Sequence, residues 1–298
     1  MEIHLASMEN ITCWAFRSLM QGITDSYTGM ISMGYLLERN KAWKEVDFFK
    51  NEQRQWLQVL TSREVECAKF LTRINEKLSE EGISSDKSES AAEKSNCYGI
   101  QLNCSCPSPM ITKIGQGSAL IKRPTKVASL VTELLKQDKY KVSVKTRLGL
   151  NDFEIREGRI FRLLEELEKI KNPNFTEVVV HFKHAKEIST GAYDYTLLKE
   201  ICDYNVPIVI NGGIKSYRDY NNIVKTITKR KNIKGLMIGR EALINPNCFT
   251  EVSNMLNCTL LKSRSLEEIN KEFKTLCEEH MPRDIYLERI KNSCPWNK

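Results

Sequence analysis

The chain has 298 residues, of which 41% are hydrophobic and 28% charged, and its formal net charge at pH 7 is +7. This composition is ordinary for a soluble globular protein, and the length can hold one barrel of about 250 residues with a small appendage. The N-terminus lacks the regions of a signal peptide, and no apolar run approaches the ~20 residues of a membrane span, so we expect a cytoplasmic protein without a membrane partner. The positive charge suits a polyanionic partner, although many proteins carry it without one.

The ten cysteines are scattered through a chain that is large enough to fold without disulfide staples. In a reducing compartment we expect most of them to be buried thiols. Cys97, Cys104 and Cys106 lie close together in the sequence. A zinc site normally has a CxxC pair and a second pair of ligands, and this chain has no such second pair. We therefore expect no metal site.

Eight short apolar runs, each ending in a polar or small residue, organise most of the chain. The predicted strands are Ile3–Met8, Tyr27–Met33, Trp56–Leu60, Tyr98–Cys104, Lys141–Arg147, Glu177–Phe182, Pro207–Gly212 and Gly235–Arg240. Helix-length amphipathic stretches lie between most of them. Eight strands that alternate with helices predict an α/β protein, a (β/α)8 TIM barrel, in which the chemistry lies where the strands end.

The segments between the strands predict where the barrel stops. Predicted helices cover residues 62–78, 126–137, 153–171 and 217–230. Residues 79–96, rich in Ser, Glu and Lys, are expected to form a mobile loop. After Pro246 no strand-like run occurs, and residues 265–291 are predicted to be helical throughout. We therefore expect a TIM-barrel catalytic domain, residues 1–246, and a small C-terminal helical module, residues 247–298.

Two glycine-containing turns follow the last two predicted strands. Asn211-Gly212-Gly213 ends one strand, and Gly239-Arg240 ends the next. Glycines let backbone N–H groups approach an anion, and the following helix N-terminus adds a partial positive charge. Because phosphate sites commonly follow strands seven and eight of such barrels, the pair predicts a phosphate cradle. The alternative is two ordinary turns between strand and helix.

Cations and a histidine end two of the preceding strands. Lys145 and Arg147 alternate along one strand, so both point the same way, into the barrel mouth. Burying two like charges is costly unless they meet an anion or hydrogen-bonding ligands, so we favour a functional role over a salt bridge to a neighbouring carboxylate. His181 ends the next strand, a position that favours ligand contact, although it is also compatible with a satisfied core histidine.

The segment Asn103–Pro107 places a thiol, Cys106, at the top of a strand and in front of a proline. Cys106 is a candidate nucleophile, but no histidine–carboxylate partner is encoded beside it. It is alternatively a proton donor, which needs a protonated thiol and hence no strong depression of its pKa. Cys104 is expected to point away from Cys106 and to pack. The simplest alternative for both is a buried thiol without a reaction to perform.

Taken in order, these segments resemble the tRNA-dihydrouridine synthases, flavin enzymes that reduce uridine in tRNA. The resemblance covers about residues 3–250. The motifs that carry it are Leu5 to Thr12 with Phe16-Arg17, the strand Trp56–Leu60, Asn103–Pro107 with its continuation to Leu120, Lys145 to Gly149, Val180-His181, Asn211 to Gly213 and Met237 to Ala242. Several motifs in the right order over this length are specific, whereas each alone would not be.

The resemblance implies a bound FMN and NADPH as its reductant. The residues it assigns to FMN are Ser7, Met8, Glu9, Gln58, Lys145, His181, Asn211, Gly212, Gly213, Gly239 and Arg240. By family analogy, the reduced flavin passes a hydride to C6 of a uracil turned out of the tRNA, and Cys106 protonates C5. Asn103 and Arg147 would hold the polar edge of the uracil. Turning the base out costs a few kcal/mol, which phosphate contacts offset.

The chain departs from the family pattern at four positions. Ser7 stands for the usual Pro, Asn10 and Ser105 for Gly, and Lys183 for Arg. The C-terminal module is also shorter than the tRNA-binding domain usual in the family. Because its basic residues alternate with acidic ones, an RNA-binding surface and a plain solvated face both stay open.

The resemblance makes tRNA the expected partner, and we expect a monomer. An alternative function in the same fold is an FMN oxidoreductase that acts on a free pyrimidine or another small molecule. A third is a non-catalytic barrel that binds RNA.

Overall fold

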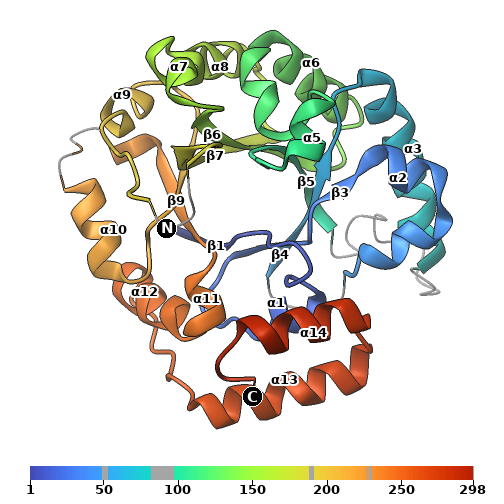
Figure 1. Ribbon diagram of the computed structural model, residues 1–298, viewed down its shortest axis with the longest axis vertical. Helices are drawn as coiled ribbons and strands as arrows, with labels where there is room; N and C mark the ends of the chain where they lie inside the picture. Colours follow the sequence, from blue (N-terminus) through green and yellow to red (C-terminus); the bar gives the residue numbers. More distant parts are fainter. Residues whose placement is uncertain (49–52, 82–96, 188–190, 226, 228–229, 298) are drawn as a thin grey trace.

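A closed parallel barrel forms the centre of the molecule (Figure 1). The computed structural model describes residues 1–48, 53–81, 97–187, 191–225, 227 and 230–297. Eight strands follow one another around the barrel: β1 (Glu2–Leu5), β2 (Asp25–Tyr27), β4 (Arg54–Leu60), β5 (Cys97–Cys104), β6 (Lys141–Gly149), β7 (Phe175–His184), β8 (Ile208–Asn211) and β9 (Ile233–Ile238). Pairing of β2 with β4 and of β1 with β9 closes the ring. The predicted (β/α)8 barrel is confirmed.

The second predicted strand, 27–33, is wrong in its bounds. It is split into β2 and the short β3 (Ile31–Ser32), and Met33 begins helix α2 (Met33–Glu38). The pairing with β4 shifts by one residue between the two pieces, from Tyr27 opposite Trp56 to Ile31 opposite Val59, and there the backbone N–H of Gln58 donates to the side-chain oxygen of Thr28 at 3.2 Å. A side chain therefore replaces one step of the strand ladder, which a pattern of apolar residues does not reveal.

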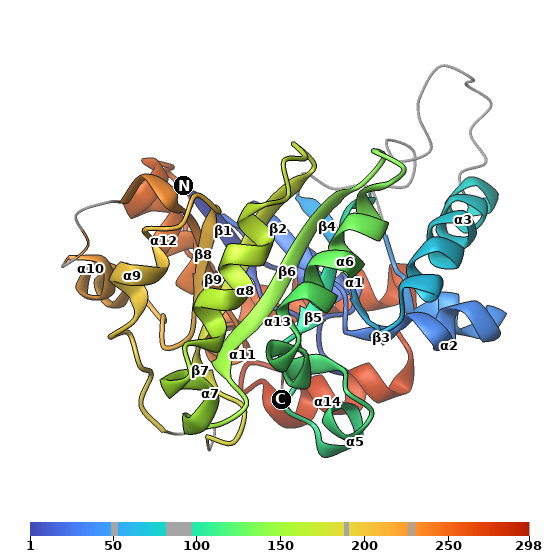
Figure 2. The same ribbon diagram turned by 90° about the horizontal axis from the view of Figure 1, so that it is seen from above.

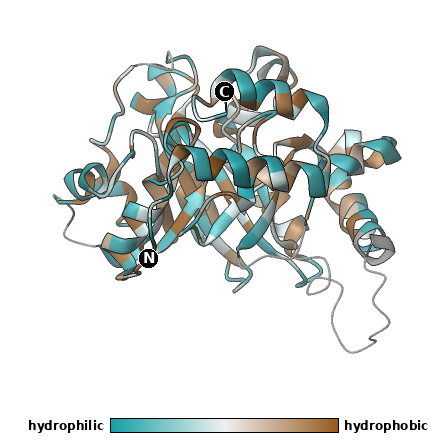
Figure 3. Ribbon diagram, turned by 90° about the horizontal axis from the view of Figure 1, so that it is seen from below, coloured by the Kyte–Doolittle hydropathy of each residue, from teal (hydrophilic) through white to brown (hydrophobic). Residues whose placement is uncertain are grey.

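Helices surround the barrel and turn their polar faces outward (Figures 1 to 3). The longer ones are α3 (Glu64–Glu81), α6 (Pro124–Leu135), α8 (Arg159–Glu168), α10 (Tyr217–Val224), α12 (Cys248–Asn257), α13 (Leu266–His280) and α14 (Asp284–Ser293). Shorter ones are α1 (Trp14–Ser18), α5 (Pro109–Lys113), α7 (Asp152–Arg156), α9 (Leu198–Ile201) and α11 (Glu241–Ile244), with 3-10 turns at Asn40–Glu45, Gly117–Lys122 and Arg230–Asn232. The segments α5, α7 and α11 follow strand ends directly and mark the mouth of the barrel, at one edge of Figure 2.

Three predicted helices differ from the observed ones, two of them because of a left-handed residue. The helix expected at 153–171 is broken at Gly158, which has φ +62°, into α7 and α8. The helix expected at 265–291 is interrupted where Met281 adopts φ +39° in front of Pro282, so α13 and α14 are separate. The helix expected at 217–230 ends at Val224. The predicted loop at 79–96 lies almost wholly outside the described residues; its first three residues continue α3.

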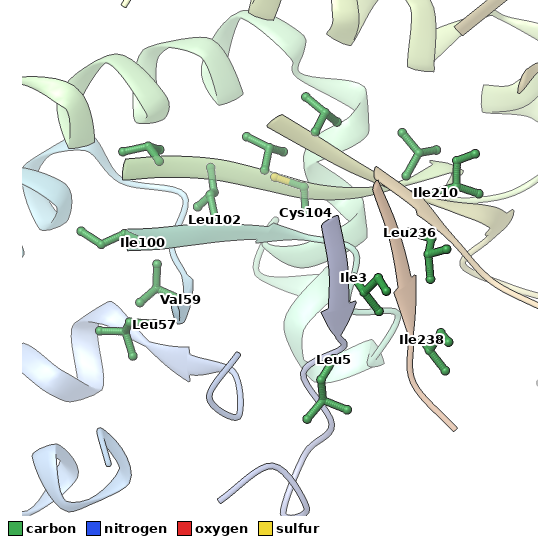
Figure 4. Close-up of a cluster of buried hydrophobic side chains, with 14 of the residues drawn as sticks. Ile3, Leu5, Leu57, Val59, Ile100, Leu102, Cys104, Ile210, Leu236 and Ile238 are labelled. Carbon is green, nitrogen blue, oxygen red and sulfur yellow. The ribbon is translucent and has the colours of Figure 1, made fainter. Parts of the chain in front are cut away.

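Alternation along the strands sorts side chains into two cores. Outward-facing positions such as Leu57, Val59, Ile100 and Leu102 pack against the helices, and Cys104 packs with them as predicted (Figure 4). The interior holds a smaller apolar cluster of Ala6, Tyr27, Trp56, Val179, Val209 and Met237. Along β7 the successive inward positions are Glu177, Val179 and His181, so the interior is charged at its base, apolar in its middle and polar at its mouth.

Candidate active site

A cavity of about 830 Å³ opens at the carboxyl ends of the strands. Its volume lies in the range of small-molecule and cofactor sites. Every residue that the sequence predicts for the site lines it: Ser7, Met8, Glu9, Gln58, Asn103, Cys106, Lys145, Arg147, His181, Asn211, Gly212, Gly213, Gly239 and Arg240. These residues come from seven strand ends and are far apart in the sequence, and the closed barrel brings them together.

The Cys106 thiol stands on a turn that its neighbours hold in place. The side-chain oxygen of Asn103 accepts hydrogen bonds from the backbone N–H groups of Ser105 and Cys106, at 2.9 and 2.8 Å. On the other side, a Cβ at Gly117 would lie 2.6 Å from the Cys106 carbonyl oxygen, so only glycine fits there. Asn103 therefore positions the thiol in this structure, and its contact with a substrate stays a prediction.

Burial keeps the Cys106 thiol protonated at neutral pH. The side chain is almost fully buried. Burial raises its pKa above the ordinary value, and the cations Lys145 and Arg147 offset that rise only in part. A protonated thiol is a poor nucleophile, but it can donate a proton, so the electrostatics favour the second of the two roles considered for Cys106.

Lys145 and Arg147 both reach the cavity from β6. The ammonium of Lys145 donates to the side-chain oxygens of Asn211, at 3.0 Å, and Ser105, at 3.4 Å. Arg147 donates to the carbonyl oxygens of Ser105 and His184. Within the described residues neither cation forms an ion pair with a carboxylate, so the salt-bridge alternative does not apply to them there. Burial, reinforced by Arg147, lowers the pKa of Lys145 to about 7.

Polar residues at the ends of β4, β7 and β8 complete the cavity wall. Gln58 accepts from the amide of Asn103 and donates to Gln101, both at 2.7 Å. Asn211 donates to the carbonyl oxygen of Met237. Burial and the surrounding cations hold the pKa of His181 well below its usual range, so the imidazole is neutral and offers one donor and one acceptor.

Gly212 and Gly213 have positive φ values, +120° and +64°, which glycine adopts most readily. The two residues therefore form a glycine turn after β8, as the sequence predicts. The following helix α10, however, is capped by its own side chains, and the Ser216 hydroxyl accepts from the backbone N–H of Asp219 at 3.3 Å. The Asp219 carboxylate accepts from the backbone N–H groups of Lys215 and Ser216, both at 3.0 Å. An anion at the turn would therefore rely on the glycine backbone and on nearby cations rather than on that helix.

Sequence reasoning missed Tyr193, which lines the same cavity. Its ring lies against Gly212 and Gly213, and its hydroxyl accepts from Arg240 at 2.8 Å. Tyr195, two residues on, donates to the carbonyl oxygen of Gly212. The segment Gly191-Ala-Tyr-Asp-Tyr195 follows the His181 strand and contains two tyrosines next to a glycine. It shows no strand or helix periodicity, so the sequence pattern alone did not place it at the cavity.

The departures from the family pattern have visible consequences. Asn10 has φ +56°, a left-handed conformation that asparagine tolerates better than most residues, so it can replace glycine there. The Ser105 side chain is buried and accepts a hydrogen bond from Lys145. The Lys183 ammonium lies over the Tyr193 ring, 4.4 Å from its centroid. None of these side chains displaces Cys106, Lys145 or Arg147 from the cavity.

Fold and site together define a (β/α)8 barrel protein with a buried thiol, cations and a glycine turn around one cavity. The family model for dihydrouridine synthases (Dus) matches residues 86–291. The chain belongs to the dihydrouridine synthase family.

Relatives along most of the chain are consistent with this assignment. A probable tRNA-dihydrouridine synthase of Aquifex aeolicus is 26% identical over 297 residues, covering 98% of this chain and 84% of that protein. The tRNA-dihydrouridine(16) synthase of Haemophilus influenzae is 26% identical over 200 residues, covering 65% of this chain and 60% of that protein. A human protein named tRNA-dihydrouridine(47) synthase NAD(P)(+)-like is 28% identical over 187 residues, covering 62% of this chain and 27% of that protein.

A solved structure with the same architecture is a GH18 chitinase from Pseudoalteromonas aurantia. It has a TM-score of 0.53 and 11% identity, and the alignment covers 86% of this chain and 100% of that one. At this identity the likeness concerns the fold alone. None of the helices in the described part of the chain is both long and apolar enough to cross a membrane.

Proposed function

We propose that this chain is an FMN-dependent tRNA-dihydrouridine synthase, which reduces the C5–C6 double bond of a uridine in tRNA with NADPH. The observation that carries the proposal is the convergence on one cavity of a protonated thiol, Cys106, with Lys145 and Arg147. The family assignment supports it, as do the names of the relatives. The NAD(P)(+) in the name of the human relative supports a nicotinamide reductant.

The residues around the cavity fit FMN. Lys183 and Arg240 both contact Tyr193, whose ring packs on the Gly212–Gly213 turn, and they would hold a phosphate monoester together with the glycine backbone. Lys145 would contact the flavin, where its positive charge would favour a negatively charged reduced cofactor, and Gln58 and His181 would offer hydrogen bonds to its polar atoms. Bound FMN would supply the two-electron reduction, which no side chain of the cavity supplies.

The chain's own part in the reaction is to hold the uracil and deliver a proton. Hydride addition at C6 leaves an electron pair that ends as a C–H bond at C5, and the S–H bond of Cys106 breaks to provide that proton. Arg147, fixed by the Ser105 carbonyl, would face a carbonyl of the uracil. Solvent returns a proton to the Cys106 thiolate, and Lys145 and Arg147 stabilise that anion meanwhile.

A tRNA partner agrees with the net charge of +7 and with the position of the C-terminal helices. Helix α14 contacts α11, whose residue Ile244 lines the cavity, so α14 lies at the mouth. Arg283 and Arg264 are engaged with Glu45 and Glu272, whereas Arg289 and Lys291 of α14 are exposed. We assign Arg289 and Lys291 to contact with the RNA backbone.

The test begins with the absorption spectrum of the purified protein, with and without added FMN, followed by anaerobic addition of NADPH. Flavin bands that bleach with NADPH are expected, and subsequent incubation with unmodified tRNA should yield dihydrouridine by mass spectrometry. A protein that takes up no FMN would overturn the proposal. Turnover of free uracil or uridine, with none on tRNA, would favour the small-molecule oxidoreductase instead.

A further inference from the structure

The Tyr193 ring occupies the space beside the Gly212–Gly213 turn. A Cβ added at Gly212 would lie 2.5 Å from the ring, and one at Gly213 would lie 2.7 Å from it. The ring thus packs directly on the two glycines, where a larger residue cannot stand. Gly212, Gly213 and Tyr193 all line the cavity, so a phosphate held by the backbone of this turn would lie next to the ring.

Two cations hold Tyr193 in this place. The Arg240 guanidinium donates to the hydroxyl oxygen at 2.8 Å, and the Lys183 ammonium lies 4.4 Å from the ring centroid. The hydroxyl lone pairs and the negative face of the ring both attract cations. Lys183 is buried, and the cation–π contact compensates part of the cost of burying its charge.

We propose that Tyr193 is a built-in competitor for the phosphate of the cofactor. With no phosphate bound, the side chain contacts Arg240 and Lys183 and packs on the glycine turn. Binding of a phosphate monoester displaces the ring, and both cations exchange an aromatic partner for an anionic one. The apparent affinity for the cofactor is then reduced by the fraction of molecules in which the ring covers the turn.

This proposal rests on the proposed FMN site, and riboflavin separates the two. Riboflavin has the same ring system but no phosphate, so its binding does not require displacement of Tyr193. FMN and riboflavin affinities of the cofactor-free full chain can be measured by quenching of flavin fluorescence. Tyr193→Ala is expected to tighten FMN about tenfold or more and to leave riboflavin unchanged, because the variant loses both cation contacts.

Two further variants sharpen the measurement. Tyr193→Phe keeps the ring over the glycines and loses the hydrogen bond to Arg240, so its FMN affinity should lie between those of the wild type and Tyr193→Ala. Tyr35→Ala removes an exposed tyrosine on α2 and should change neither affinity.

Weaker FMN binding by Tyr193→Ala would overturn the proposal and assign the hydroxyl to holding the phosphate. Unchanged FMN binding would overturn it as well, because the ring would then not compete. If neither the wild type nor Tyr193→Ala binds FMN or riboflavin, the proposed function fails together with it. Flavin binding that does not change when Tyr193 is replaced overturns the proposal that Tyr193 competes with the phosphate, and it leaves the proposed function intact.

Discussion

The chemistry available in the cavity depends on which protons its side chains hold. Cys106 keeps its proton because burial raises the pKa of the thiol, and His181 stays neutral because burial and nearby cations lower its pKa. Lys145, with a pKa of about 7, changes charge near neutrality. The mouth of the barrel therefore contains a proton donor, Cys106, and a lysine whose protonated form an anionic ligand would stabilise.

Replacing Cys106 by Ala should separate proton delivery from reduction of the cofactor. We expect dihydrouridine formation to fall about 10²–10⁴-fold, the range for loss of a general acid, while the rate of flavin reduction by NADPH is unchanged. Stopped-flow absorbance and mass spectrometry of the tRNA measure the two steps. Cys258→Ala, at an exposed cysteine, is the matched control. Equal loss of both steps in Cys106→Ala would assign the residue to the fold of the site instead.

Lys145 should lower the stability of the cofactor-free protein in a pH-dependent way. Its pKa is about 7 in the folded chain, against 10.5 for an ordinary lysine, so between these pH values the unfolded chain binds the additional proton. The cost of burying Lys145 therefore grows as the pH falls from 10.5 to 7 and is constant below that range. Lys145→Met should be more stable than the wild type by about 2 kcal/mol at pH 6, after the lost hydrogen bond to Asn211 is deducted.

The gain from Lys145→Met should nearly vanish at pH 10, where the wild-type lysine is neutral. Urea unfolding of the cofactor-free protein at both pH values measures it, and Lys69→Met, at an exposed position of α3, controls for the loss of a lysine. A gain of equal size at both pH values would contradict the lowered pKa. The same variant should bind FMN more weakly, a cost to function of greater stability.

Residue types at strand ends made much of the site predictable. Alternation along β6 places Lys145 and Arg147 together, and the barrel rule places both beside His181 and Asn211. Tyr193 was not predictable in this way, because it follows no periodic pattern and its place depends on how residues 191–197 fold back over the glycine turn. The hydrogen bonds of Asn103 could not be predicted either. Residue type alone does not say whether a side-chain amide binds backbone N–H groups or a substrate.

At the scale of elements, the strand starts carry a second polar cluster, at the opposite end of the barrel. Glu2 of β1, Asp25 of β2 and Glu177 of β7 meet there with Arg54 of β4 and Lys234 of β9. Three carboxylates against two cations leave one negative charge, largely out of contact with water. The residue pattern at the carboxyl ends of the strands, from which the cavity is predicted, carries no information about this cluster.

His4 supplies the missing positive charge. Its Nδ1 lies 2.8 Å from the hydroxyl oxygen of Tyr27, and that hydroxyl donates to Glu177, so Nδ1 must carry a proton. Its Nε2 lies 3.3 Å from Glu2 and 3.5 Å from Asp25, two acceptors that would repel a lone pair. Burial opposes protonation, but the carboxylates outweigh it and raise the pKa of His4.

The protonated His4 makes stability decrease with rising pH. Because the folded pKa lies above the unfolded value of about 6.5, the stabilisation is complete below pH 6.5 and is lost as the pH rises through the folded pKa. His4→Gln should reduce the unfolding free energy by about 3–5 kcal/mol at pH 6, since it leaves buried carboxylates without their counter-charge. The deficit should shrink at alkaline pH in urea unfolding experiments.

Two controls identify the proton as the cause. His280→Gln removes an imidazole at the end of α13 and should leave the pH dependence intact. Glu2, His4 and Asp25 also place donor atoms within 4.8 Å of one another, a spacing that a divalent cation accepts. Arg54 and Lys234 already bind these carboxylates, so a chelator should not change the stability of the wild type. A deficit that is independent of pH would contradict a charged His4.

Element types were more predictable than element bounds. All eight strands of the barrel were found because each is an apolar run with a polar end. The errors fall where one backbone angle or one side chain decides: the second strand is split at Thr28, Gly158 separates α7 from α8, and Met281 ends α13. Hydrophobic periodicity continues across each of these breaks, so it carries no information about them.

At the scale of the whole molecule, the segment after residue 246 packs against the barrel helices. Helix α12 contacts α10, and α13 contacts α1. The Trp296 ring, near the C-terminus, stacks on Phe16 of α1 with centroids 6.3 Å apart and meets the edge of Phe273 of α13 at 5.5 Å. We therefore propose that residues 247–298 stabilise the barrel in addition to any contact with RNA, whichever residue marks the boundary between domain and module.

Trp296→Ala tests that coupling. Trp296 is buried in the main core, so its truncation should cost about 3–5 kcal/mol of unfolding free energy, the range for a buried aromatic residue. Since Phe16 belongs to the barrel and Phe273 to the module, the loss should appear in one cooperative transition for the whole chain, followed by circular dichroism in urea. Leu260→Ala, at a side chain that is 96% exposed, should change stability by less than about 0.5 kcal/mol. Two separate transitions, with only the weaker one shifted by Trp296→Ala, would instead mean that the module folds on its own and that the barrel does not depend on it.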